Sequence, residues 1–200
     1  MLASDQILRP HSLSIYQLNR LQAGSYIPMP SDPAKGHAAL RRGRVSTPNA
    51  AYFLTICTDQ RASGLTEAEV GANILGEMQA AQNDGVWSVR CAVIMPDHFH
   101  LLVELGAKLS LEKAVSRLKA KTSAGLRAIG LGWERGFFDH RLRADDDRLE
   151  VFLYVYLNPY RAGLCARTES WPWFHCHPDD WTWFRDYLDT DRPPPQWLAV

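Results

Sequence analysis

Two apolar runs joined by a Pro-Asp step restrict the fold of this chain more than any other feature. Residues 87–95 and residues 98–104 are each rich in β-branched and other apolar side chains, and each has the length of a strand. Pro96 and Asp97, between the runs, are residue types that favour turns. The two runs therefore predict a pair of antiparallel strands in the middle of the chain.

The segments around this pair alternate between strand and helix patterns. Two further strands are predicted at residues 51–58 and 136–142, and helices at residues 67–84, 111–129 and 147–157. The last helix must end or kink before Pro159, which has no amide hydrogen to donate. The order predicts an α+β fold, a ferredoxin-like sandwich whose mainly antiparallel sheet has four to five strands, with helices packed on it.

Length and composition are those of an ordinary globular protein, with 200 residues, 46% hydrophobic and 22% charged. No run approaches the roughly 18 apolar residues of a membrane helix, and the N-terminus lacks the pattern of a secretion signal, so we expect a cytoplasmic protein. The four cysteines form no C-x-x-C pair and are expected to be free thiols. We divide the chain into an irregular basic arm (1–48), a folded domain (49–175) and a Trp- and Pro-rich tail (176–200).

The charges are balanced in number but uneven in position. Lys and Arg total 22, as do Asp and Glu, whereas a nucleic-acid-binding protein usually has a basic excess. Basic side chains nevertheless form two clusters, one in the N-terminal arm and one in the helix at 111–129. The clusters comprise Arg41, Arg42 and Arg44, and Arg117, Lys119, Lys121 and Arg127. Without further information, the arm is better explained as a solvated tail.

Two histidines share one face of the strand at 98–104. Side chains alternate along a strand, so His98 and His100 point to one face and Phe99 to the other. Two adjacent imidazoles can hold a divalent metal and leave coordination positions open for catalysis. An H-x-H motif alone is more often a pair of structural histidines, so this pattern needs a partner elsewhere in the chain.

The helix at 147–157 offers such a partner. With about 100° of rotation per residue, Tyr156 falls on the apolar stripe, whereas Tyr154 falls well away from its centre. Asn158 lies one turn after Tyr154 if the helical turn persists. A tyrosine hydroxyl can act as a nucleophile, and a metal that polarises a phosphate would offset its high pKa. Alone, Tyr154 could equally be a packing residue, and Tyr156 is a rival nucleophile.

Taken together, these segments resemble a known family. Residues 95–103 (MPDHFHLLV) resemble the metal-binding strand of the HUH-type single-strand transposases. Residues 154–164 (YVYLNPYRAGL) resemble the tyrosine helix of one branch, the REP-associated tyrosine transposases. The run at 53–58 resembles their first strand, 136–140 the segment before the tyrosine helix, and 41–44 their basic arm.

The resemblance implies a function and a role for each residue. It implies that His98, His100 and Asn158 bind Mg²⁺ or Mn²⁺ and that Tyr154 attacks a phosphodiester. Cleavage of single-stranded DNA would leave a 5′-phosphotyrosine bond and a free 3′-hydroxyl, and reversal would rejoin the strand. Hairpins of repetitive extragenic palindromes (REP elements) are the implied partner, bound by a monomer or homodimer. The expected DNA-binding residues are Arg41, Arg42, Arg44, Lys119, Lys121 and Arg161.

Two other functions remain open at the level of sequence. One is a REP-hairpin-binding protein that has lost catalysis, although the presence of His98, His100, Tyr154 and Asn158 favours an enzyme. The other is a zinc hydrolase using a further group of His and Cys residues, whose spacing matches no common zinc site. That group comprises His140, His175, Cys176 and His177.

Overall fold

The computed structural model describes residues 46–143 and 148–198 of the chain. The strands are β1 (Ala51–Cys57), β2 (Trp87–Ile94), β3 (His98–Leu105), β4 (Phe138–Arg141) and β5 (Phe174–Cys176). The α-helices are α3 (Ala68–Asn83), α4 (Leu111–Ala128), α5 (Arg148–Arg161) and α6 (Pro178–Phe184). Short 3-10 turns are η1 (Asp59–Arg61), η2 (Arg185–Tyr187) and η3 (Pro195–Trp197).

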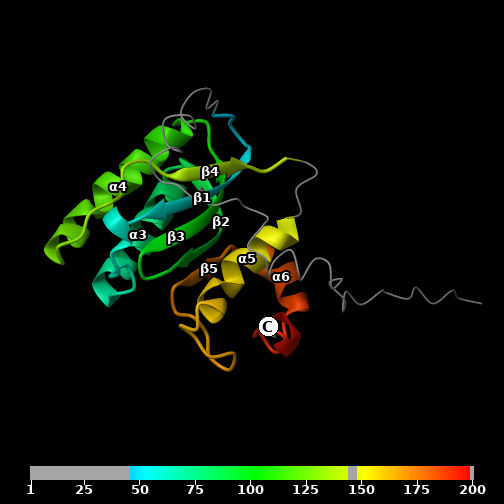
Figure 1. Ribbon diagram of the computed structural model, residues 1–200. Coiled ribbons are helices and arrows are strands. Elements are labelled where there is room, and N and C mark those ends of the chain that lie inside the picture. Colours follow the sequence, from blue (N-terminus) through cyan, green and yellow to red (C-terminus); the bar gives the residue numbers. More distant parts are fainter. Residues whose placement is uncertain (1–45, 144–147, 199–200) are drawn as a thin grey trace, which may run out of the picture.

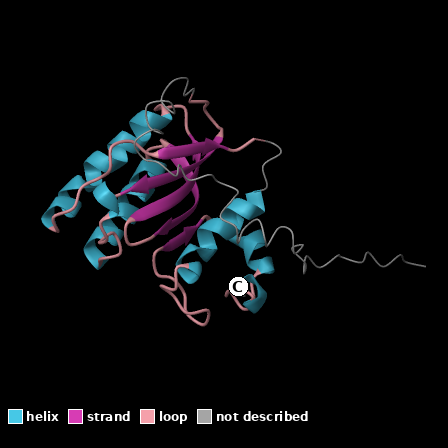
Figure 2. Ribbon diagram, in the orientation of Figure 1, coloured by secondary structure: helices cyan, strands magenta, loops and turns pink. Residues whose placement is uncertain are grey.

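The strands form one five-stranded sheet in the order β4-β1-β3-β2-β5, and each neighbouring pair is antiparallel. Helices α3 and α4 cover one face, and α5 and α6 lie on the other (Figure 1; Figure 2). The first four strands with α3 and α4 have the β-α-β-β-α-β order of a ferredoxin-like fold. The predicted fold class is therefore confirmed.

The alternation of side chains along β3 separates the two halves of the core. Phe99 and Leu101 pack with α3 and α4, whereas Leu102 packs with α5. In the pairing of β1 with β3, Thr55 lies opposite His100 and Ile56 opposite Phe99. Because successive side chains point to opposite faces, this register turns His98 and His100 toward α5.

Helix α5 continues through Pro159 to Arg161, so the expected end of this helix at Leu157 is wrong. Proline removes the helical hydrogen bond that the Val155 carbonyl oxygen would accept from residue 159, and the helix continues despite this cost. The carbonyl oxygens of Asn158 and Pro159 accept hydrogen bonds from the amides of Ala162 and Leu164, at 3.0 and 2.9 Å. Burial of Pro159 and Tyr160 against the core further favours the extension.

The C-terminal segment supplies two elements that the sequence patterns did not predict, β5 and α6. Strand β5 pairs with β2 and spans the proposed domain boundary at residue 175. The buried carboxylate of Asp180 in α6 forms ion pairs with Arg90 Nε at 2.7 Å and with an Arg148 guanidinium nitrogen at 2.8 Å. Phe184 is fully buried. The segment from 174 to 184 is thus part of the folded layer beside α5.

Among the described helices, none combines the length and hydropathy needed to span a bilayer. The acidic run at 145–147 and residues 1–45 of the N-terminal arm lie outside the described residues.

Candidate active site

The two histidines of β3 face each other below helix α5. His98 and His100 are 9% and 1% exposed, and their Nε2 atoms are 3.1 Å apart. Phe53 of β1 stacks on the His100 ring, with centroids 5.3 Å apart. The site is thus built into the sheet and is not carried on a loop, so the imidazoles are held rigidly.

The Nδ1 atom of each imidazole contacts a different polar side chain. Thr55 Oγ1 lies 2.9 Å from His100 Nδ1, and Asp97 Oδ1 lies 2.7 Å from His98 Nδ1. A carboxylate only accepts hydrogen bonds, so Nδ1 of His98 carries a hydrogen that it donates to Asp97. Arg61 in turn contacts Asp97, with its Nε 2.7 Å from Oδ2. The contacts of Thr55 and Asp97, with Arg61 behind Asp97, orient both imidazole rings.

The electrostatics favour an unprotonated His100. Burial, followed by the nearby charges of His98 and Arg61, lowers the pKa of His100 well below its usual 6.5. Burial acts to raise the pKa of Asp97, but the hydrogen bonds and charges of His98 and Arg61 outweigh it and lower that pKa. At neutral pH His100 is therefore neutral, and Asp97, which contacts His98, is ionised.

This arrangement fits a divalent cation. Two nitrogens bound to one cation at about 2.1 Å and at right angles lie about 3 Å apart. The Nε2 atoms are separated by 3.1 Å, and the contacts of Thr55 and Asp97 with the Nδ1 atoms leave both Nε2 atoms facing the same region. No group of three or more His, Cys, Asp and Glu in the described ranges could hold a metal, so further ligands would be amide oxygens, water or DNA.

Tyr154 brings its hydroxyl to this pair. Its oxygen lies 3.5 Å from His100 Nε2, and the two ring centroids are 5.1 Å apart. Tyr154 is half-buried, as its position off the apolar stripe predicts. Burial raises the pKa of Tyr154, while a hydrogen bond from Asn158 and the charges of Arg161 and Arg61 act to lower it. The hydroxyl therefore stays protonated near neutral pH and requires activation to attack.

Asn158 and Arg161 follow Tyr154 along the same side of α5. Asn158 is half-buried, and its Nδ2 donates to the Tyr154 carbonyl oxygen at 3.1 Å. Its side-chain oxygen is the atom that a cation would use. Burial lowers the pKa of Arg161, while its interaction with Tyr154 acts to raise it. Both side chains therefore belong to the surroundings of the Tyr154 hydroxyl.

Tyr156 occupies a different environment. It is 5% exposed, and its hydroxyl donates to the Asp191 carbonyl oxygen at 3.1 Å. Burial and the neighbouring Tyr160 raise its pKa far above its ordinary value of 10. Tyr156 therefore faces away from the histidines, which makes it the poorer candidate nucleophile.

The expected DNA-binding residues are not all brought to this site. Arg41, Arg42 and Arg44 lie outside the described residues. Lys119 and Lys121 lie on α4, across the sheet from α5. The Lys119 ammonium donates to the carbonyl oxygens of Glu134, at 2.8 Å, and Gly136. Lys119 thus stabilises the loop before β4. The sequence, in which Lys119 was grouped with other basic residues, did not predict this structural role.

The alternative zinc group is separated by the fold. His140 lies in β4 and His175 in β5, at opposite edges of the sheet. His175 and Cys176 are consecutive in a strand, so their side chains point to opposite faces. The described residues therefore give no support to a zinc hydrolase.

Three contributors to the site were not recognised from sequence: Thr55, Asp97 and Arg61. Thr55 is a polar residue in an otherwise apolar strand, a signal that becomes informative only when the register places it opposite His100. Asp97 was considered only as a turn residue. Arg61 lies in η1 with a φ of 57°, and no sequence pattern indicates this conformation.

Comparison with known proteins shows which family this domain is similar to. Residues 46–140, which contain the sheet and both histidines, match the family described as IS200-like transposases. Over residues 46–140 the chain is thus similar to this transposase family.

Within that class the similarity is to REP-associated tyrosine transposases. One protein of this name from Haemophilus influenzae is 29% identical over 111 residues, covering 44% of this chain and 62% of the relative. Another from Escherichia coli is 25% identical over 101 residues, covering 49% and 59%. The chain thus spans about three fifths of the length of these curated relatives. The resemblance derived from the sequence motifs is confirmed.

A solved structure supports the fold. A REP-associated tyrosine transposase bound to a REP hairpin matches with a TM-score of 0.61 at 18% identity, covering 78% of this chain and 92% of that chain. At this level of identity the match shows a shared fold, and the open antiparallel sheet with its helices is common to both.

Proposed function

We propose that this protein cleaves and rejoins single-stranded DNA at REP-type hairpins, with Tyr154 as the nucleophile. The observation that carries the proposal is the approach of the Tyr154 hydroxyl to 3.5 Å from His100 Nε2, which itself lies 3.1 Å from His98 Nε2. A nucleophile beside two candidate metal ligands is the constellation that phosphodiester cleavage requires. The match of residues 46–140 to the transposase family supports this proposal.

In the proposed step, the Tyr154 oxygen forms a bond to phosphorus and the bond from phosphorus to the 3′ oxygen breaks. The tyrosine proton is released, and the departing oxygen gains a proton to become a free 3′-hydroxyl. The product is a 5′-phosphotyrosine. Attack by a 3′-hydroxyl on that phosphorus reverses the sequence and rejoins a strand, so no external energy source is needed.

His98, His100 and the Asn158 side-chain oxygen would hold Mg²⁺ or Mn²⁺. Such an ion polarises the phosphate and stabilises the charge of the transition state. The protein's own contribution is to orient the imidazoles through Thr55 and Asp97 and to restrict the Tyr154 ring between Phe53 and His100. Arg161 supplies positive charge near the same hydroxyl.

Hairpin DNA is the proposed substrate because relatives named REP-associated tyrosine transposases share this domain, and one structure with the same fold holds a REP hairpin. The second candidate function is hairpin binding without cleavage. Tyr154 and both histidines are present and close together, which favours the catalytic reading.

The test is formation of a covalent adduct. Protein is incubated with a single-stranded oligonucleotide carrying a REP-type hairpin and Mn²⁺ or Mg²⁺, and the products are separated on a denaturing gel. We expect an adduct for the wild-type protein and none for Tyr154→Phe, because the reacting oxygen is removed. Tyr187→Phe is the matched control, since it removes a hydroxyl outside the site, and it should retain the adduct.

Two results would contradict parts of the proposal. If hairpin DNA binds but no adduct forms under any metal condition, the protein is a binding module. If an adduct persists in Tyr154→Phe and disappears in Tyr156→Phe, the nucleophile is Tyr156.

A further inference from the structure

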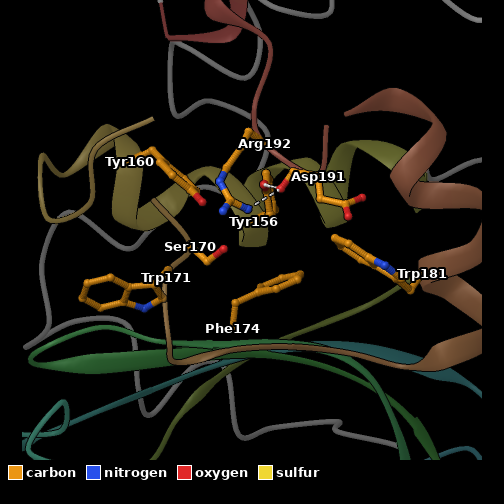
Figure 3. A pocket seen from close by; sticks show the side chains of 8 residues that line it. All are labelled: Tyr156, Tyr160, Ser170, Trp171, Phe174, Trp181, Asp191 and Arg192. Atoms are coloured by element: carbon orange, nitrogen blue, oxygen red, sulfur yellow. Dashed lines mark hydrogen bonds between the residues drawn. The ribbon is translucent and has the colours of Figure 1, made fainter. Parts of the chain in front are cut away.

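A second site-like feature lies on the other side of α5 from the histidines. Here α5, the loop before β5, α6 and the segment near residue 191 enclose a pocket of about 250 Å³ (Figure 3). Its lining comprises Tyr156, Tyr160, Ser170, Trp171, Phe174, Trp181, Asp191 and Arg192. Five of these eight side chains are aromatic, and Phe174 and Trp181 remain partly exposed.

Several of the rings are fixed in place by hydrogen bonds at their polar ends. The hydroxyls of Tyr156 and Tyr160 donate to the carbonyl oxygens of Asp191 and Glu169, at 3.1 and 3.0 Å. Trp171 Nε1 donates to the Ile94 carbonyl oxygen at 2.9 Å. The polar ends of these rings are thus engaged by the protein itself, and what the pocket offers a ligand is mainly aromatic surface.

A tight turn presents the two charged residues. Asp189 and Arg192 exchange both backbone hydrogen bonds, and the central residues Thr190 and Asp191 have φ values of 52° and 59°. Such turns favour glycine or asparagine at the centre, and a β-branched threonine there is costly. The turn fixes the Arg192 guanidinium, which also donates through Nε to the Thr168 carbonyl oxygen at 3.3 Å.

The aromatic surface, together with Arg192 and Asp191, suits the binding of a nucleobase better than the binding of a phosphate. Unpaired bases stack on aromatic side chains and on arginine planes, and their edges carry both donors and acceptors. Arg192 donates and Asp191 accepts, so both kinds of base edge can be met. The Asp191 carboxylate, which lies 3.4 Å from an Arg185 guanidinium nitrogen, places a negative group beside Arg192 and disfavours a phosphate there. A volume of about 250 Å³ lies just below the roughly 300–1,000 Å³ of sites for larger ligands, as expected for one base.

We propose that this pocket holds a single unpaired nucleobase of the DNA strand whose phosphate is positioned at Tyr154. The inference rests on the proposed function, because it assumes a DNA substrate. Tyr156 and Tyr160 follow Tyr154 by two and six residues on one helix, about 3 and 9 Å along its axis. The nucleophile and the pocket thus lie at similar positions along the axis of α5, and the proposal requires the bound strand to pass around this helix. The pocket adds affinity and selects the unpaired base without touching the reacting atoms.

The test uses the full chain carrying Tyr154→Phe, so that bound DNA stays intact. 2-Aminopurine replaces each unpaired base of the hairpin oligonucleotide in turn, and its fluorescence is measured on titration with protein. We expect quenching at one position, because that base stacks on the aromatic rings. Arg192→Gln and Trp181→Leu should abolish the quenching and weaken binding about 10-fold.

Arg127→Gln is the matched control for Arg192→Gln, since it removes the same charge from α4, across the sheet. It should retain the quenching at the same position. Circular dichroism melts show whether each variant is folded. Quenching at no position, or equal quenching in wild type, Arg192→Gln and Trp181→Leu, would overturn the pocket assignment.

The outcome is separable from that of the adduct assay. A covalent adduct without position-specific quenching would leave the proposed function intact and refute the base pocket. Position-specific quenching lost in both pocket variants, in a protein that forms no adduct, would support the pocket while refuting catalysis.

Discussion

The two faces of the sheet bury side chains of different kinds. Toward α3 and α4, the residues of β1 and β3 are apolar, such as Ile56, Phe99 and Leu101. Toward α5, the same two strands bury Thr55 and His100. Within the described ranges, the buried histidine and acidic side chains are His98, His100, Glu150 and Asp180, and none of these packs in the α3 and α4 core.

Because of this difference, alternate side chains of a single strand have different roles: one set stabilises the fold and the other forms the candidate site. An apolar face is stabilised by removing hydrocarbon from water, whereas a polar face requires a partner for every buried group. On the α5 side, Thr55 and Asp97 are the partners of His100 and His98. Neighbouring residues of β3 should therefore respond to mutation in opposite ways.

The largest expected effect comes from the apolar face. Leu101→Ala should lower the free energy of unfolding by about 2–5 kcal/mol, because Leu101 is fully buried and its loss leaves a cavity. Chemical denaturation measures this change. The Mn²⁺ affinity of the folded variant, measured by calorimetry, should stay unchanged, while His100→Ala should lose Mn²⁺ binding. A fall in metal affinity for Leu101→Ala would contradict the separation of the two faces.

A smaller effect is expected from the partners of the histidines. Asp97→Asn should weaken Mn²⁺ binding by about 10- to 100-fold, because the ionised carboxylate orients the His98 ring toward the metal position. Calorimetric titration of metal into the protein checks this without relying on activity. Asp84→Asn, which removes an exposed acid near Arg117, is the matched control and should bind as wild type does. Equal affinities for Asp97→Asn and wild type would mean that Asp97 serves only the turn.

The smallest effect concerns Lys119 on α4. Burial lowers the pKa of Lys119 from 10.5 to about 8, with Glu134 and Cys57 opposing that shift. Between these values the folded protein has released a proton that the unfolded chain still holds, so raising the pH favours folding. Relative to Lys119→Met, wild-type stability should rise by about 1 kcal/mol from pH 8 to pH 9. A difference that is constant with pH would show that Lys119 titrates as an exposed lysine.

Much of the fold was predictable because it is encoded locally. The periodicity of apolar residues identified β1, β2, β3, α3 and α4 to within a few residues. The separation of Tyr154 from Tyr156 followed from helical geometry alone, and their burial agrees with it. The end of α5 was not predictable in this way, because the continuation through Pro159 depends on what the last turn packs against.

The site was predictable only in part. The motifs indicated His98, His100, Tyr154 and Asn158, but the orienting roles of Thr55 and Arg61 depend on strand pairing and on a turn conformation. The aromatic pocket gave no signal at all, since its residues come from α5, a loop, β5, α6 and a tight turn. A local sequence pattern does not indicate which residues from distant parts of the chain will contact one another in the folded protein.

The sequence by itself determined which residues alternate along β3 and which side of α5 each tyrosine occupies, because backbone geometry dictates both. Only the tertiary structure decided that α5 lies over the histidine face, that Lys119 is engaged by loop carbonyls, and that the C-terminal segment completes a pocket. These outcomes depend on the packing of whole elements against one another. The free energy of burial comes from contacts among residues that are distant in sequence, so no single motif predicts it.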